Sequence, residues 1–79
     1  MNLINVQSSN ISKIGFEKNK RTSLHSKPIN VLRIVFNTGM MYDYYNVEEK
    51  VFNEFLKAKS IGKYFWANIK DKYSYEKVT

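Results

Sequence analysis

The stretch that decides the fold runs from Phe36 to Ser60 and reads FNTGMMYDYYNVEEKVFNEFLKAKS. A strand ends near Asn37, and Gly39 supplies the positive φ that a tight hairpin turn favours. A tyrosine-rich strand is predicted to follow at 40–45. Asn46 is a good helix N-cap, and Glu49 three residues later completes a capping-box arrangement. The order strand, turn, strand, helix therefore indicates a mixed fold with an antiparallel hairpin.

Two helices are predicted after the hairpin. The first runs from Asn46 to about Lys59, because apolar side chains recur along it at helical spacing and charged side chains cover its other side. Its apolar stripe consists of Val47, Val51, Phe52, Phe55 and Leu56. Ser60 is positioned to cap a second, shorter helix from Ile61 to about Lys70.

Two further strands are predicted in the part of the chain that precedes the strand at 40–45. Residues 31–37 alternate cleanly between two faces, and a strand is expected near 10–16. The tail 72–78 also alternates and fits a short edge strand. In the strand at 40–45, we expect Asp43 to face water and Tyr42 and Tyr44 to point to the opposite face.

These elements predict an α+β fold in a single domain, residues 1–79. A small antiparallel β-sheet of about three strands packs against one main helix and one short C-terminal helix. The predicted core consists of Ile11, Ile14, Phe16, Leu32, Ile34, Phe36, Val51, Phe52, Phe55, Leu56, Phe65 and Ile69. A domain of this size buries only about 60% of its unfolded surface, so its aromatic side chains must contribute strongly.

Composition argues against several classes of protein. The chain has no cysteine and one histidine, His25, so we expect neither a disulfide nor a metal site. No apolar run approaches the roughly 20 residues that span a bilayer. The N-terminal residues lack the basic and apolar regions of a signal peptide. We therefore expect a cytoplasmic protein with no membrane partner and no cofactor.

No catalytic arrangement is evident. His25 lies between serines in one polar loop, where nothing orients it. Glu48, Glu49 and Glu54 lie on the solvated face of the first helix, and no glycine-rich phosphate loop exists. We therefore expect a protein that is not an enzyme.

The net charge of +6 is compatible with a polyanionic partner as well as with simple solubility. Acidic residues concentrate in the middle of the chain, between two basic segments. One basic segment, residues 17–30, is polar, contains Pro28 and has no apolar period, so we expect a mobile loop. Its basic side chains are Lys18, Lys20, Arg21, His25 and Lys27.

The order of these motifs resembles the KTSC domain, which is named after a segment at the C-terminus of some lysyl-tRNA synthetases and also occurs as small stand-alone proteins. The matching pieces are residues 8–11, Ile14-Gly15-Phe16, residues 32–36, Gly39, Tyr42-Asp43-Tyr44, Val47, residues 51–58, residues 60–65, Ile69-Lys70 and residues 73–75. Together they span about residues 6–78. The resemblance implies the fold above and, through the association with a tRNA enzyme, suggests RNA as a partner.

Two hypotheses for function follow. In the first, the chain is a small basic module that binds RNA or another nucleic acid through phosphate contacts and base stacking. The phosphate contacts would come from Arg33, Lys63, Lys70 and Lys72, and the stacking from Tyr45, Tyr73 and Tyr75. In the second, it is a protein-binding module, such as a small bacteriophage or mobile-element inhibitor of the anti-CRISPR kind, which docks onto a host nucleoprotein.

Three aromatic residues remain open to two interpretations. Trp66 lies one position past the apolar stripe of the second helix, where it either closes the core or anchors an interface. Tyr42 and Tyr44 either form a stacking platform or pack beneath the helix with their hydroxyls at its edge, and their shared face with the core favours packing.

Overall fold

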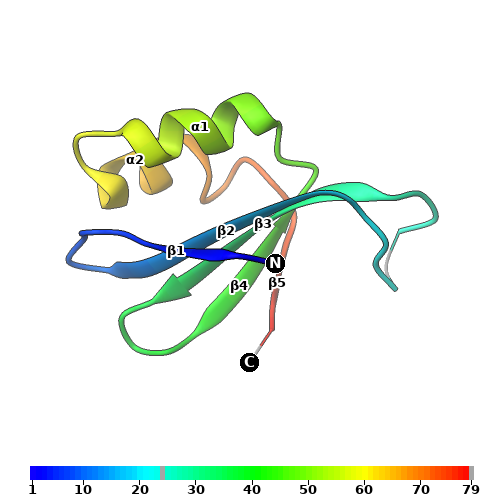
Figure 1. The fold of residues 1–79 in the computed structure, drawn as a ribbon, viewed down its shortest axis with the longest axis horizontal. Helices are drawn as coiled ribbons and strands as arrows, with labels where there is room; N and C mark the ends of the chain where they lie inside the picture. The colour runs from blue at the N-terminus through cyan, green and yellow to red at the C-terminus, as the bar shows by residue number, and fades with distance from the viewer. Residues whose placement is uncertain (24, 79) are drawn as a thin grey trace.

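Five strands form one antiparallel sheet in the order in which they occur along the chain (Figure 1). The computed structural model describes residues 1–23 and 25–78. The strands are β1 (Leu3–Asn5), β2 (Ile11–Lys20), β3 (Ile29–Phe36), β4 (Met41–Tyr45) and β5 (Tyr75–Lys77). The helices α1 (Glu49–Lys57) and α2 (Ile61–Asn68) lie between β4 and β5 in the chain. The α+β class is confirmed, and "about three strands" undercounts the sheet.

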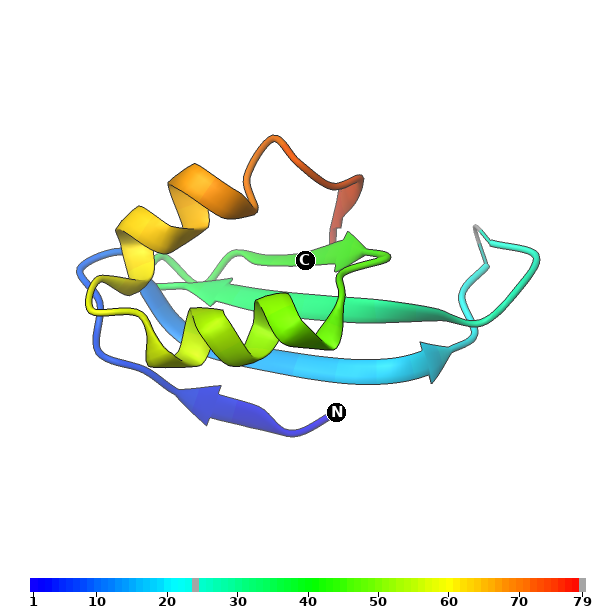
Figure 2. The same ribbon diagram turned by 90° about the horizontal axis from the view of Figure 1, so that it is seen from above.

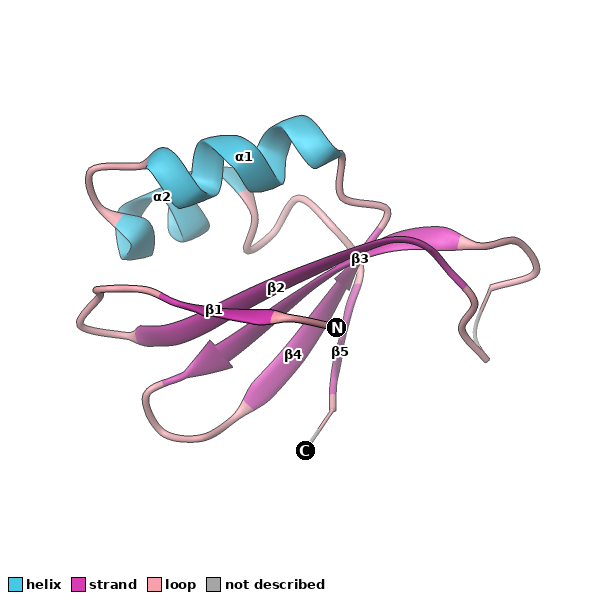
Figure 3. Cartoon of the chain, viewed as in Figure 1, coloured by secondary structure: helices cyan, strands magenta, loops and turns pink. Residues whose placement is uncertain are grey.

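Both helices pack on the same face of the sheet, so the molecule has two layers (Figure 3). Seen from the helix side, α1 runs along the sheet over β2, and α2 lies toward β4 (Figure 2). The opposite face of the sheet, which no helix covers, is called the open face below. Neither helix in the described part of the chain is long and apolar enough to cross a membrane.

The strand that the sequence did not indicate is β1. It is three residues long and exposed, so it carries no alternation of buried and exposed positions. It pairs with β2 where Leu3 lies opposite Gly15. A Cβ atom at Gly15 would come within 2.7 Å of Leu3 Cδ2 and 2.9 Å of Met1 Sδ. The missing side chain therefore lets the N-terminal segment pack closely over β2. The short edge strand expected in the tail is present as β5.

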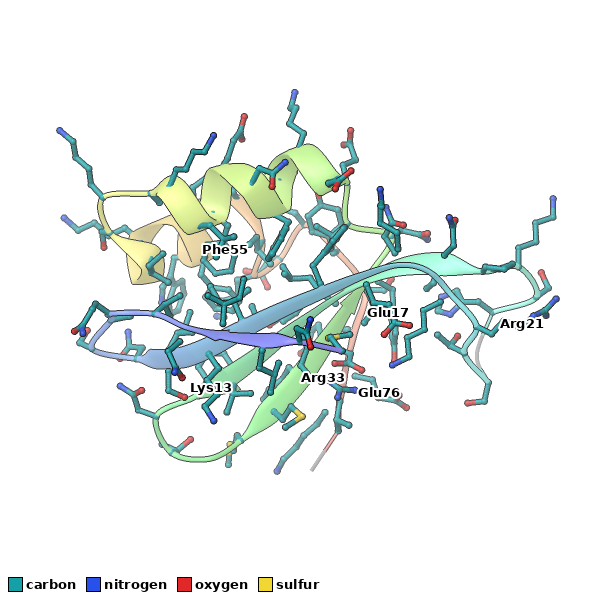
Figure 4. The ribbon with its side chains drawn as sticks, in the orientation of Figure 1. Lys13, Glu17, Arg21, Arg33, Phe55 and Glu76 are labelled. Carbon is teal, nitrogen blue, oxygen red and sulfur yellow. The ribbon has the colours of Figure 1, made fainter. Side chains whose placement is uncertain are left out.

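The predicted bounds of the basic loop, 17–30, are wrong because the flanking strands are longer than expected. β2 continues to Lys20 and β3 begins at Ile29, which leaves 21–28 as the connection. The pairing between β2 and β3 shifts between Glu17 and Lys20, and Asn19 has a φ of 53° there. Arg21 lies at the far end of this hairpin (Figure 4). Leu24 lies outside the described residues, and mobility of the connection stays a prediction.

The predicted N-cap of the first helix is also wrong. Asn46 has a φ of 61°, a left-handed conformation in which the chain turns out of the sheet, and its N–H donates to the Asn30 carbonyl over 2.8 Å. The N-cap is Glu48, which makes no side-chain capping hydrogen bond. Asparagine favours both helix caps and left-handed turns, and here pairing with β3 decides between them. The second cap is confirmed, since Ser60 Oγ accepts from the Lys63 N–H.

The predicted core is confirmed between the two layers. Seven of its members are buried: Ile11, Ile14, Leu32, Ile34, Phe55, Phe65 and Ile69. The other five are partly buried and pack against them: Phe16, Phe36, Val51, Phe52 and Leu56. Phe55 projects from α1 into the space above the sheet (Figure 4). The sequence-based list missed Tyr44, Val47 and Ile61, which are also buried in this cluster.

Candidate nucleic-acid interface

Helix α2 presents Trp66 to solvent because of the way the helix docks on the sheet. Its neighbour Phe65 is 5% exposed and packs edge-on against Phe36, with ring centroids 5.6 Å apart. One residue along a helix turns the side chain by about 100°. Trp66 consequently points away from the core and is 61% exposed. An exposed tryptophan of this kind is costly to leave in water and is typical of a binding surface.

A lysine lies over this tryptophan. The chain turns immediately after α2, where the Lys70 N–H donates to the Phe65 carbonyl over 2.9 Å. The turn brings Lys70 Nζ to 3.9 Å from the centroid of the Trp66 ring. Attraction between an ammonium group and the face of an indole is worth about 0.5–1 kcal/mol at an exposed site. One face of Trp66 is therefore held next to a positive charge.

Trp66 and Lys70 border a groove of about 540 Å³, which we call the aromatic groove. Its aromatic and basic lining residues include Phe36, Tyr42, Trp66, Lys70 and Tyr75, and Met40 also lines it. Three of them are well exposed: Met40 at 45%, Trp66 at 61% and Tyr75 at 56%. Tyr75 is held by ring contacts to Tyr42 and Tyr44, with centroid distances of 5.7 and 5.4 Å. The groove thus offers several aromatic surfaces, contributed by the sheet and by α2.

A second groove lies on the other side of Trp66, and we call it the lysine groove. It is lined by polar side chains of the β1–β2 connection, including Ser8 and Ser9, by Lys59 from the α1–α2 connection and by Lys63 from the first turn of α2. Asn10, Gly62 and Trp66 line both grooves. Neither lysine belongs to an ion pair within residues 1–23 and 25–78. Both ammonium groups therefore remain available to an anionic partner.

The structure brings together part of the predicted phosphate and stacking set. Lys63 lines the lysine groove, and Lys70 and Tyr75 line the aromatic groove. Lys72 is exposed in the turn after α2 but lines neither groove. Tyr73 is partly buried against the core, and burial together with the negative charge of Glu48 raises its pKa. Its ring is therefore less accessible than a stacking role requires.

Arg33 lies apart from this cluster, on the open face (Figure 4). Its Nε and Nη2 donate to the two carboxylate oxygens of Asp43 over 2.7 and 2.9 Å. The expectation that Asp43 faces water is wrong, because this residue is 7% exposed and the arginine opposite it in the sheet covers it. The bidentate hydrogen bond to Asp43 raises the pKa of Arg33. The guanidinium is thus engaged within the sheet.

Tyr45, which was expected to stack on a base, lies on the open face with its ring buried. It is 6% exposed, and its hydroxyl donates to Glu76 Oε1 over 2.9 Å. The His25 ring lies 4.9 Å from it and covers part of its surface. Burial, with the hydrogen bond and charge of Glu76, raises the pKa of Tyr45 to about 12. Arg33 and Tyr45 are therefore structural residues of the open face.

The open interpretations of the aromatic residues are now decided. Tyr44 is 4% exposed and packs edge-on against Phe65, and Tyr42 packs against the same core while lining the aromatic groove. Trp66 does not close the core, because it is 61% exposed. The sequence-based site omitted Trp66 and Lys59, although the position of Trp66 next to the apolar stripe was a usable signal. The turn that returns Lys70 to Trp66 had no such signal.

Comparison with known proteins places this fold. The family model of the KTSC domain matches residues 7–73. The crystal structure of a KTSC domain protein from Yersinia pestis superimposes with a TM-score of 0.83 at 29% sequence identity, and the similarity covers 99% of this chain and 97% of that one. No curated protein matches the chain. The chain therefore belongs to the KTSC domain family.

Proposed function

We propose that the chain is a non-enzymatic module that binds single-stranded nucleic acid, with RNA as the preferred partner, through the surface around Trp66. The observation that carries the proposal is the exposed indole with Lys70 Nζ 3.9 Å from its centroid, at the border of an aromatic groove. Unstacked bases bind to aromatic rings at about 1–3 kcal/mol per base, and nearby lysines contact the phosphates. Both kinds of group are present at this surface.

Charge supports a polyanionic partner at this surface. Lys59, Lys63 and Lys70 line the two grooves, against one acidic residue, Asp71, within the described part of the chain. The whole chain carries +6, so its long-range field favours approach of an anion. The resemblance to the appendage of a tRNA enzyme favours RNA over DNA.

The proposal is tested with an eight-nucleotide oligo(U) RNA. Trp66 is the only tryptophan, so intrinsic fluorescence reports on the proposed surface directly. We expect quenching that weakens as salt rises. Trp66→Ala should weaken binding by about 1–3 kcal/mol while leaving the salt slope unchanged. Lys70→Ala should lower the slope by about 0.7. Lys50→Ala, an exposed lysine of α1 outside both grooves, is the matched control.

The same surface has one feature that favours a protein partner. Met40, Trp66 and Tyr75 are large exposed side chains of types that are enriched at the centres of protein interfaces. If the protein binds no RNA or DNA with salt dependence at low ionic strength, the nucleic-acid proposal fails. An inhibitor that docks onto a host nucleoprotein then becomes the better proposal.

A further inference from the structure

The two grooves meet at Trp66, and they differ in chemistry. The aromatic groove exposes the rings of Tyr42 and Tyr75 and the side chain of Met40, whereas the lysine groove exposes Lys59 and Lys63 among serine hydroxyls. A nucleotide has the same division, with a flat base joined through its ribose to a charged phosphate. One ligand can therefore satisfy both grooves only if a path connects them past the indole.

Such a path would run past Gly62, a residue that the two grooves share. A Cβ atom placed on Gly62 would lie 3.6 Å from Asn10 Nδ2 and 3.7 Å from Ser8 Oγ. These are ordinary contact distances, so the backbone there has no steric need for glycine, and no positive φ requires it. A glycine in the first turn of a helix is less favourable than alanine. The absent side chain leaves open the space between the two grooves.

We propose that the two grooves are the two subsites of one nucleotide site. The aromatic groove takes one unstacked base, the lysine groove takes the adjoining phosphate, and the sugar crosses at Gly62 beside Trp66. This inference rests on the proposed function and adds which groove binds the base and which binds the phosphate. Lys70 occupies the face of Trp66 in the free protein and moves to a phosphate when a base stacks on the indole.

Three variants test the arrangement with oligo(U) and with an oligomer of eight abasic ribose phosphates. Gly62→Leu fills the path and should weaken oligo(U) binding tenfold or more, while binding of the abasic oligomer, which places no base in the aromatic groove, should fall by a clearly smaller factor. Asn53→Leu, which adds the same side chain on the exposed side of α1, should bind both as the wild type does. Gly62→Ala should give a smaller loss with no decrease in melting temperature, which separates the path from folding.

The lysines are tested through the salt slope. The double variant Lys59→Ala/Lys63→Ala should lower the slope by about 0.7 per lysine and still allow full quenching of Trp66 at saturation. Lys50→Ala/Lys57→Ala, with both lysines exposed on α1, should keep the wild-type slope. The two-subsite arrangement is overturned if Gly62→Leu binds oligo(U) normally, or if both double variants have the same slope. In that case a loss of binding in Trp66→Ala would still support the proposed function. Absence of wild-type binding would overturn both.

Discussion

The ion pair between Arg33 and Asp43 gives Arg33 a structural role in place of the phosphate contact that the sequence predicted. Asp43 follows the alternation expected of a strand, but the registration of β3 against β4 places Arg33 directly opposite it. The arginine and aspartate side chains are 22% and 10% exposed. From sequence, the register between two strands is not visible, so the arginine looked available for phosphate.

Removing one partner of this pair should destabilise the fold. Asp43→Asn should cost about 1.5–3 kcal/mol in the free energy of unfolding, because a half-buried guanidinium loses a bidentate charged acceptor. The double variant Arg33→Met/Asp43→Leu should recover most of that loss, since an apolar pair of similar volume replaces both charges. Urea unfolding measures both values. An Asp43→Asn protein as stable as the wild type would show that the pair contributes nothing.

Tyr45 makes stability sensitive to alkaline pH. Its folded-state pKa is about 12, above the ordinary value of 10.0, because burial and Glu76 disfavour the phenolate. The folded state then keeps its proton to higher pH than the unfolded state does. The stabilisation is fully present below pH 10 and is lost as the pH rises from 10 to 12. Tyr44 and Tyr64 have similarly raised pKa values of about 12, mainly through burial.

Tyr45→Phe isolates this effect. At pH 8 the variant should be less stable by about 1 kcal/mol, because the hydrogen bond to Glu76 is lost. Between pH 8 and pH 11 it should lose less stability than the wild type, because phenylalanine cannot ionise. The two proteins share every other ionisable group, so the effect of those groups cancels in the comparison. Stability is measured by urea unfolding at each pH. An equal loss of stability in the two proteins would contradict the raised pKa of Tyr45.

A helix or strand can be predicted from the sequence where its buried residues recur at a regular spacing. It cannot be predicted where only pairing with a distant segment forms it. The helices and the strands β3 and β4 carry strong alternation or helical spacing, and each is present close to its expected bounds. β1 carries no such period and is formed by pairing with β2, where Gly15 leaves room for the side chains of Leu3 and Met1. The same holds for Asn46, where a hydrogen bond to β3 overrides a local capping preference. These outcomes depend on contacts between distant segments.

The missing cap of α1 predicts a stabilising substitution. Glu48 has the extended backbone of an N-cap, with φ of −69° and ψ of 144°, yet its side chain makes no capping hydrogen bond. Glu48→Asp keeps the charge and shortens the side chain to a length that reaches the free N–H groups of the first turn. We expect a gain of about 0.5–1 kcal/mol in the free energy of unfolding.

Glu48→Ala is the control for this substitution. Because the wild type has no capping bond to lose, alanine should leave stability close to the wild-type value. The two variants are compared by urea unfolding at neutral pH. A destabilised Glu48→Ala protein would show that the glutamate already stabilises the first turn of α1 in solution.

Considered over the complete fold, the two faces of the sheet carry different kinds of residue. The helix-covered side holds the core, and Trp66, Lys70 and Tyr75 gather at its margin. The open face holds polar side chains that bond one another, including Arg33 with Asp43 and Tyr45 with Glu76. The sequence shows which residues are basic or aromatic. It does not show which face of the sheet each residue reaches or which residues are already paired. The predicted site therefore combined residues of the open face with residues near Trp66.

This separation makes a prediction that needs no mutation. In nitrogen–proton spectra, the indole N–H of Trp66 and the Nε–H of Arg33 each give a distinct signal, one from each face. On addition of oligo(U), the Trp66 signal should shift or broaden, because its ring joins the interface. The Arg33 signal should stay in place, because Asp43 holds that proton at a donor–acceptor distance of 2.7 Å. Salt added without RNA is the control for general screening. A larger change at Arg33 than at Trp66 would move the interface to the open face, and the grooves around Trp66 would then have to be explained by a protein partner.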